Sequence, residues 1–358
     1  MKFIEEFRDK NIAERLIYEI SKISIPKIKI MEVCGTHTVS IFRYGIRNLL
    51  PEHIKLISGP GCPVCVTPNI DIDFAIALSR HKDVILATFG DMMKVPGSTS
   101  SLQKEKAEGR DIRIIYSPLE AMSIAKDNPK KIVIFFAIGF ETTSPTIAST
   151  IIRAKRDGIE NLFFLNSQKR IPPAICALIQ SKDIMIDGFI LPGHVSTIIG
   201  SDPYQFISNE FLLPAVITGF EPLDVLQGIW MLVKMIREER PAIEIQYKRA
   251  VRKEGNPLAI KKIKEVFKED DATWRGLGLI PDSGYCFREE YKRFDARNIE
   301  IEVEPSKENN QCVCGKVLKG IITPLECSLF RKVCHPENPI GPCMVSIEGA
   351  CHTYFKYY

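Results

Sequence analysis

The sequence lacks the common motifs of nucleotide-dependent and metal-dependent enzymes. It contains no Gly-x-x-x-x-Gly-Lys-Ser/Thr loop, no Gly-x-Gly-x-x-Gly after a strand, no His-Glu-x-x-His and no Cys-x3-Cys-x2-Cys. Nucleotide-driven chemistry therefore has no support in the sequence. What remains is thiol chemistry, because nine of the eleven cysteines lie in three places along the chain.

An excess of charge of one sign and a long apolar run are also missing. The 48 basic and 44 acidic residues give a net charge of +4, too balanced to indicate nucleic acid binding. The longest apolar run, Ile132 to Phe140, is far shorter than a membrane span. The first residues, MKFIEEFRDKNIAERL, are charged and amphipathic, without the apolar segment of a signal peptide. We therefore expect a cytoplasmic protein that binds neither nucleic acid nor a membrane.

Short apolar segments alternate with predicted helices over the first 240 residues. The predicted strands are Ile28–Val33, Ile54–Ser58, Val84–Thr88, Ile112–Tyr116, Lys131–Ala137, Leu162–Leu165, Phe189–Leu191 and Ala215–Thr218. Such alternation is typical of parallel α/β sheets. We predict an α/β fold with two Rossmann-like lobes, at residues 1–127 and 128–240, and a third domain at residues 241–358.

Unusual polar residues follow directly on the predicted strands. Those that could take part in chemistry are Cys34, His37, Cys62, Cys65, Glu141 and His194. In parallel α/β sheets, sites form at the carboxyl ends of the strands. We therefore expect these residues to contribute to a functional site, with a hydrogen-bonded structural role as the alternative for His194.

Two of these loops have the chemistry of reactive thiols. Cys62 and Cys65 form a Cys-x-x-Cys just before a predicted helix, where backbone N–H groups favour a thiolate. Such a pair can close to a disulfide or bind a metal. Cys34 lies near His37, which offers a nucleophile or soft metal ligand beside a base. The alternative for all three cysteines is a quiet buried thiol.

The C-terminal tail is dense in cysteine and poor in continuous apolar pattern. Its six cysteines are Cys312, Cys314, Cys327, Cys334, Cys343 and Cys351. Structural disulfides are uncommon in the cytoplasm, and a zinc site usually shows two Cys-x-x-Cys pairs. An iron–sulfur cluster needs four thiolates and tolerates irregular spacing, which leaves two thiols for a redox-active disulfide. We favour the cluster with a disulfide, and zinc or reduced structural thiols remain as alternatives.

Taken together, the motifs resemble those of the HypD family of nickel–iron hydrogenase maturation proteins. The segments that carry this resemblance are Cys34–Thr38, Gly59–Cys65, Phe89–Met92, Gly139–Thr143, Pro192–Ser196 and the tail that ends in Cys343–Cys351. Each motif is weak alone, but all of them in this order form a specific signal over nearly the whole chain.

The resemblance implies two α/β lobes and a C-terminal iron–sulfur domain with a 4Fe-4S cluster. Matched position by position, the cluster ligands would be Cys312, Cys327, Cys334 and Cys351. The remaining pair, Cys314 and Cys343, would form a redox-active disulfide beside the cluster, an arrangement similar to ferredoxin–thioredoxin reductase.

The resemblance also implies a function. The family assembles the iron of the hydrogenase, which carries two cyanides and one carbon monoxide, in complex with a small HypC-type chaperone. Cyanide arrives from a HypE-type partner. Cys34 would bind this transient iron, Cys62 and Cys65 would pass electrons to it, and Glu141 and His194 would orient or protonate the incoming ligands.

This function requires Cys34 to lie close to Cys62, with both facing the tail. Two alternatives remain at the level of sequence. One is a cluster-dependent dithiol/disulfide oxidoreductase that acts on a protein disulfide, and the other is a zinc-stapled binding module without redox activity.

Overall fold

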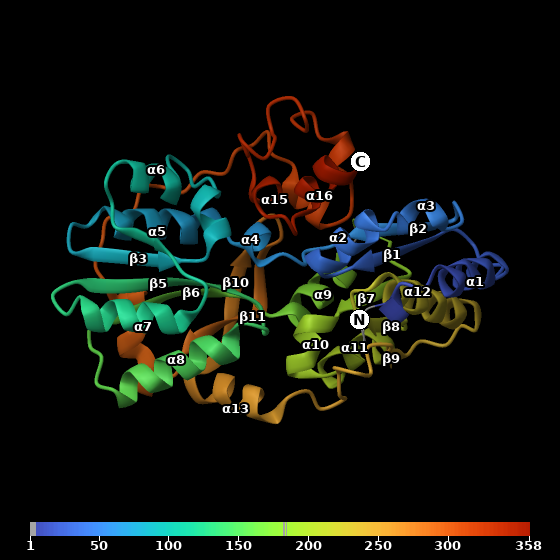
Figure 1. Ribbon diagram of the computed structural model, residues 1–358, viewed down its shortest axis with the longest axis horizontal. Helices are drawn as coiled ribbons and strands as arrows, with labels where there is room; N and C mark the ends of the chain where they lie inside the picture. Colours follow the sequence, from blue (N-terminus) through green and yellow to red (C-terminus); the bar gives the residue numbers. More distant parts are fainter. Residues whose placement is uncertain (1–4, 182, 184) are drawn as a thin grey trace.

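A computed structural model describes residues 5–181, 183 and 185–358. The chain forms two parallel sheets that lie beside each other, with the C-terminal tail seated over the junction between them (Figure 1). An antiparallel hairpin of β10 (Phe267–Trp274) and β11 (Gly278–Phe287) stands between the two sheets. The prediction of an α/β fold with parallel sheets in two Rossmann-like lobes is confirmed.

The first sheet, called sheet A, has the strand order β2-β1-β7-β8-β9. Its strands are β1 (Ile28–Glu32), β2 (Ile54–Ser58), β7 (Gly188–Pro192), β8 (Ala215–Thr218) and β9 (Ile243–Ile245). All neighbours are parallel, and Ile30 pairs with Leu56 on one side and Gly188 on the other. The ends of β1, β2 and β7 therefore meet at one edge.

The second sheet, sheet B, has the order β4-β3-β5-β6 and is also parallel. Its strands are β3 (Val84–Thr88), β4 (Ile112–Ile114), β5 (Ile132–Gly139) and β6 (Leu162–Gln168). The strands β2, β3 and β8 match their predicted ranges residue for residue. Continuous apolar segments gave these ranges, because strands buried on both faces need apolar residues at every position.

The predicted lobe boundaries do not match the sheets. Sheet A joins β1 and β2 to strands that follow residue 187, so all of sheet B is inserted within sheet A. The third region also starts differently, since β9 lies beyond residue 240 and pairs with β8. Apolar patterns predict where strands occur, whereas their pairing depends on contacts between residues that are far apart in the chain.

Helices cover both faces of each sheet, as the βαβ connections require. One face of sheet A is covered by α1 (Lys10–Ser21), α2 (Gly35–Arg43), α3 (Ile46–Leu49) and α12 (Pro222–Arg237). The other face is covered by α9 (Ile171–Gln180), α10 (Gly193–Ile199) and α11 (Gln205–Asn209). One face of sheet B is covered by α5 (Asn69–Arg80) and α6 (Leu102–Ala107). The other face is covered by α7 (Pro118–Asp127) and α8 (Ser144–Arg156), and α13 (Pro257–Val266) packs against α8. No helix among the described residues is long and apolar enough to cross a bilayer.

The helix predicted to start near Thr67 and Pro68 is preceded in the structure by a separate short helix. Residues Pro63–Val66 form a separate turn of helix, α4, and Thr67 ends it by donating its hydroxyl to the carbonyl oxygen of Pro63 at 2.8 Å. The longer helix α5 then starts at Asn69, with Pro68 rather than Thr67 at its N-cap. The Cys-x-x-Cys therefore begins a helix of its own.

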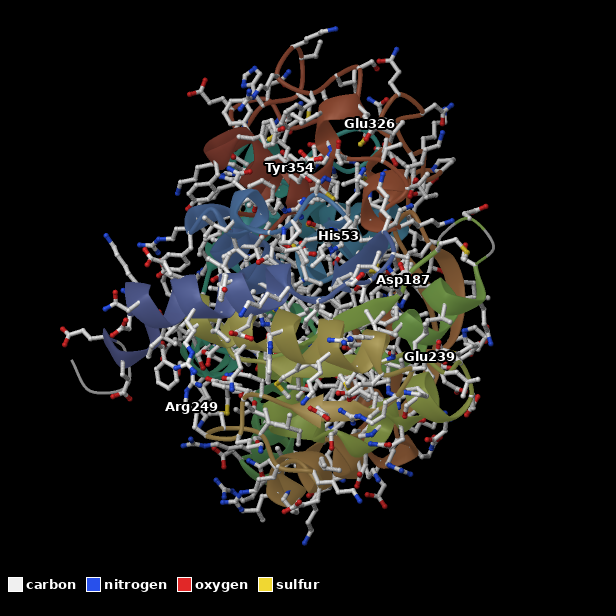
Figure 2. All side chains as sticks on the ribbon, turned by 90° about the vertical axis from the view of Figure 1, so that its right-hand side faces the viewer. His53, Asp187, Glu239, Arg249, Glu326 and Tyr354 are labelled. Carbon is white, nitrogen blue, oxygen red and sulfur yellow. The ribbon has the colours of Figure 1, made fainter. Side chains whose placement is uncertain are left out.

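The tail forms three short helices, α14 (Cys314–Leu318), α15 (Pro342–Val345) and α16 (Ala350–Tyr357). It packs on the rest of the chain through α15 against α4 and α16 against α2. Arg47 fixes the second contact by donating to the hydroxyl of Tyr354 at 2.8 Å. In Figure 2 the labelled Tyr354 and Glu326 lie on the tail, above His53, which is next to β2. The tail thus covers the two helices that follow β1 and β2.

A buried ionic network ties α5 to the end of sheet B. Asp71 and Lys169 are each 4% exposed, with 3.8 Å between Oδ2 and Nζ. Asp71 also accepts hydrogen bonds from Arg297, at 2.6 Å, and from Ser167. Because a buried charge without its partner is costly, the network stabilises this part of the fold only as a complete set.

We expect the substitution Asp71→Ala to destabilise the protein by about 3–5 kcal/mol, because it leaves the Lys169 ammonium buried without its carboxylate. The control is Asp111→Ala, which removes an exposed ion pair with Arg113 at 2.8 Å and should cost less than about 1 kcal/mol. Urea denaturation measures both free energies of unfolding. Equal losses in the two variants would contradict this account of the network.

Candidate functional site

Two cysteines stand at the N-termini of the helices that follow neighbouring strands. Cys34 is the N-cap of α2, where the backbone N–H groups of Thr36 and His37 favour its thiolate. Cys62 is the N-cap of α4, and its sulfur accepts from the backbone N–H of Cys65 at 3.3 Å. Since β1 pairs with β2 in parallel, both thiols belong to the same edge of sheet A.

The loops that carry these two cysteines touch each other. The backbone N–H of Gly35 donates to the carbonyl oxygen of Gly61 at 3.1 Å. A Cβ atom at Gly61 would lie 2.3 Å from Cα of Cys34, so only glycine allows this approach. The structure therefore brings the Cys34 loop and the Cys-x-x-Cys loop together.

A cavity of about 300 Å³ opens beside Cys34. Its walls come from three parts of the chain: Thr142 and Thr143 after β5 of sheet B, His194 after β7 of sheet A, and Glu348 from the tail. His194 is exposed, so the cavity reaches the solvent. Both sheets and the tail thus present their loops to one thiol.

The Cys34 thiol is held in its protonated form. It is 8% exposed, and burial together with the negative charge of Glu348 raises the pKa of Cys34 to about 12. The hydrogen bonds from the helix N-terminus oppose this rise but do not cancel it. A thiol in such a place becomes a thiolate when a metal cation takes the place of its proton.

Glu348 is a site residue that the sequence motifs contain but that we did not single out. Its Oε1 accepts a hydrogen bond from the hydroxyl of Thr36 at 2.6 Å, and its negative charge acts on the thiol of Cys34. A Cβ atom at Gly35 would lie 2.5 Å from the carbonyl oxygen of Glu348. The available signal was the position of Glu348 between Cys343 and Cys351, in a segment that the sequence marked as functional.

The two predicted histidines share one aromatic partner but occupy different environments. Phe220 stacks on His37 at 4.7 Å between ring centroids and on His194 at 3.9 Å. His37 is fully buried, and its Nε2–H donates to the carbonyl oxygen of Gly219 at 3.0 Å. Burial lowers the pKa of His37 to about 4, so the ring is neutral. The His194 side chain lines the Cys34 cavity, whereas the His37 side chain does not.

Glu141 also lies away from the Cys34 cavity. It lines a second cavity on the other side of its loop, although its neighbours Phe140 and Thr142 line the first. Its Oε1 accepts a hydrogen bond from the backbone N–H of Ile171 at 3.0 Å. Burial raises the pKa of Glu141 to about 7. The structure therefore does not place this carboxyl beside Cys34.

The Cys-x-x-Cys connects to the tail through contacts between thiols. The thiol of Cys65 lies close enough to those of Cys62 and Cys343 to interact with both, and Cys343 interacts in turn with Cys314. Cys314 interacts with Cys312. Burial raises the pKa of Cys65 well above that of an ordinary thiol, and its two sulfur partners raise it further. The five sulfurs form one continuous path within the central core.

The remaining tail cysteines gather around this path. Cys351 is hydrogen-bonded to Cys343, and Cys334 interacts electrostatically with Cys312 and Cys327. The backbone N–H of Ile340 donates to the sulfur of Cys334 at 3.4 Å. Within residues 5–181, 183 and 185–358, no group of three or more His, Cys, Asp or Glu side chains is arranged to hold a single metal ion.

Comparison with known proteins identifies the relatives of this chain. A family model named HypD, described as "Hydrogenase formation hypA family", matches residues 11–358. The chain is 46% identical to the hydrogenase maturation factor HypD2 of Bradyrhizobium diazoefficiens, over 100% of this chain and 97% of that protein. It is 45% identical to HypD of Azotobacter vinelandii and 42% identical to HypD of Escherichia coli, over 100% of this chain and 97% and 98% of theirs.

These matches extend over the loops after β1 and β2, the cavity beside Cys34 and the whole tail. The resemblance inferred from the sequence motifs is thereby confirmed. The chain belongs to the HypD family of hydrogenase maturation factors.

Proposed function

We propose that the chain is a redox-active scaffold on which the iron group of nickel–iron hydrogenases, carrying two cyanides and one carbon monoxide, is assembled. The observation that carries this proposal is the path of thiols from Cys312 and Cys314 in the tail, through Cys343 and Cys65, to the loop that touches Cys34. The path joins a source of electrons to a place where a metal can be held.

Cys34 would bind the iron as one of its ligands. A soft thiolate suits iron(II) with strong-field diatomic ligands, and the neighbouring cavity of about 300 Å³ gives room for them. His194 and Thr142 line this cavity and would orient the incoming ligands through hydrogen bonds. Iron is here the substrate that the scaffold holds and later releases.

The partners fit the exposed side of this cavity. We propose that a HypC-type chaperone covers it and supplies a second cysteine ligand to the iron. A HypE-type partner would deliver cyanide there. Exposed His194 marks the open side, and Glu348 of the tail also lines the cavity.

The thiol contacts define the order of electron transfer. When Cys62 and Cys65 have passed two electrons to the iron group being assembled at Cys34 and have released two protons, they are joined as a disulfide. The Cys343 thiolate then attacks the sulfur of Cys65, and Cys62 leaves and takes up the proton that Cys343 released. Cys314 next attacks the sulfur of Cys343, which returns Cys65 to a thiol and leaves a Cys314–Cys343 disulfide.

The tail cysteines fit a 4Fe-4S cluster as the resident cofactor. Cys312, Cys327, Cys334 and Cys351 would hold it, and its chemistry would be to supply the electrons that reduce the disulfide. Two features support this fit. Cys334 interacts electrostatically with two of the other three ligands, and it receives backbone N–H groups from Ile340 and Gly341, as cluster thiolates do.

A cluster-dependent dithiol/disulfide oxidoreductase would use the same thiols on a protein substrate. The Cys34 cavity favours the scaffold, because a general reductase needs no buried third thiol beside a ligand-sized space. An infrared spectrum distinguishes the two functions, since only the scaffold carries iron-bound cyanide and carbon monoxide.

The first prediction concerns Cys34. The chain purified without oxygen together with its HypC-type chaperone should show infrared bands of metal-bound cyanide and carbon monoxide, and Cys34→Ala should lose them because the iron loses a ligand. Cys176→Ala, a cysteine of α9 outside the thiol path, is the control and should keep the bands. Bands of full intensity in Cys34→Ala would show that another group binds the iron.

The second prediction concerns the contact between the Cys-x-x-Cys and the tail. In the double variant Cys62→Ser/Cys314→Ser, mild oxidation should join Cys65 to Cys343, because each has lost its other redox partner. Peptide mass spectrometry under non-reducing conditions detects this link. The control Cys62→Ser/Cys343→Ser leaves Cys65 and Cys314, which are not in contact, and should form no such link. A link of equal yield in both variants would contradict the proposed order of transfer.

The third prediction concerns the cofactor. The anaerobic protein should contain about four iron and four sulfide per chain. Cys327→Ala should lose the cluster and disorder the tail, while the sheets keep their cores. Iron and sulfide analysis with circular dichroism measures both effects, and Cys176→Ala again serves as the control. Stoichiometric zinc without visible absorption would favour the zinc-stapled module instead.

A further inference from the structure

The second cavity, which Glu141 lines, is larger than the cavity beside Cys34. It measures about 460 Å³ and is formed by the end of β6, helix α13 and the β10–β11 hairpin. The polar residues of its wall are Glu141, Arg170, Lys264, Lys268, Glu269, Tyr285 and Arg288. Figure 1 shows α13 crossing beneath the hairpin at this place. None of the functions proposed above uses these residues.

Positive charge predominates in this cavity. Arg170 is neutralised by Glu269, at 2.6 Å. Lys264 and Lys268 form no salt bridge within the part of the chain that the structure describes, and Arg288 donates from Nε to the backbone carbonyl oxygen of Lys264 at 2.6 Å. The wall also holds two carboxyl groups, Glu141 and Glu269, but in the described part of the chain neither forms a salt bridge with Lys264, Lys268 or Arg288.

Glu141 is a buried acid with an incomplete set of hydrogen bonds. The side chain is 2% exposed, and Oε1 is engaged by the backbone N–H of Ile171. Oε2 is buried and has no hydrogen-bond partner among the described residues. Buried polar atoms are nearly always paired, so this oxygen calls for a partner that the chain does not supply. The carboxyl interacts electrostatically with Arg170, Glu269 and Tyr285, which all line the cavity.

The rest of the wall is apolar. Ile260, Ile263 and Phe267 come from α13 and the start of β10, and Pro172 comes from the start of α9. A cavity of this size and composition is typical of sites for small organic molecules. The cations of the wall favour a ligand with negative charge. The apolar part of the wall favours a ligand with an organic group over a bare inorganic ion.

We propose that this cavity binds a small organic anion, a phosphate or a carboxylate on an apolar stem, whose charge is met by Lys264, Lys268 and Arg288. An oxygen of the anion accepts a hydrogen bond from Oε2 of Glu141 in its protonated form. The loop Gly139–Ser144 contributes to both cavities, so the occupied site lies directly behind the wall that faces Cys34.

The test is isothermal titration of the full-length, cluster-loaded protein with benzoate, phenyl phosphate and inorganic phosphate. We expect benzoate or phenyl phosphate to bind more tightly than inorganic phosphate. Lys264→Gln/Lys268→Gln should weaken that binding about 10-fold or more, because hydrogen bonds to charged groups are lost. The control Lys261→Gln/Lys248→Gln removes the same charge outside the cavity and should bind as the unaltered protein does.

The proton on Glu141 gives a second readout. The pKa of Glu141 is raised by burial to about 7, so the carboxyl loses its proton between pH 6 and pH 8 and then repels an anion. The groups that face it are Arg170, Glu269, Tyr285 and Tyr204, and burial holds the pKa values of both tyrosines above this range. Benzoate stays ionised throughout, so its affinity should fall from pH 6 to pH 8, and Glu141→Gln, whose amide still donates, should abolish this fall.

The outcomes of the titration distinguish the possible ligands of this cavity. Tighter binding of phenyl phosphate assigns the site to phosphates, and tighter binding of benzoate assigns it to carboxylates. No binding of either compound, or equal binding in the two double-lysine variants, would overturn the proposal. Because the titration measures neither iron nor thiols, its result is independent of the proposed function.

Discussion

The close approach of two glycine-containing loops is the constraint on which the rest of the site depends. Gly61 lies against the backbone of Cys34, and Gly35 lies against the backbone of Glu348. These contacts stack the loop after β2 on the loop after β1, and the tail on top of both. A side chain at either glycine would clash with the backbone of the neighbouring segment, so the segments would have to move apart.

Burial gives the assembled thiols their chemical character. The low dielectric constant around Cys34 and Cys65 disfavours their thiolates, so both remain protonated without a metal or a sulfur partner. Solvent oxidants are kept away from such groups, whereas neighbouring thiols are in contact. The exchange that we propose among Cys65, Cys343 and Cys314 would therefore take place inside the core, away from competing reactions with solvent.

The insertion of sheet B within sheet A explains how loops distant in sequence come to face one thiol. Chain segments after β5 and β7 leave different sheets but turn toward the same junction, over which the tail is seated (Figure 1). The Gly139–Ser144 loop is thin enough to present Thr142 to one cavity and Glu141 to another. Glu141 and Thr142 lie in the tight turn before α8, where the backbone changes direction and successive side chains face different sides.

The sequence by itself determined the parallel α/β class, the ranges of strands such as β2 and the family, because local apolar patterns and motif order express these properties. Only the tertiary structure decided which strands share a sheet, that Cys65 meets Cys343, and that Glu348 reaches the Cys34 cavity. It also turned Glu141 away from that cavity. Strand pairing and side-chain direction depend on packing between segments hundreds of residues apart, and no local pattern contains that information.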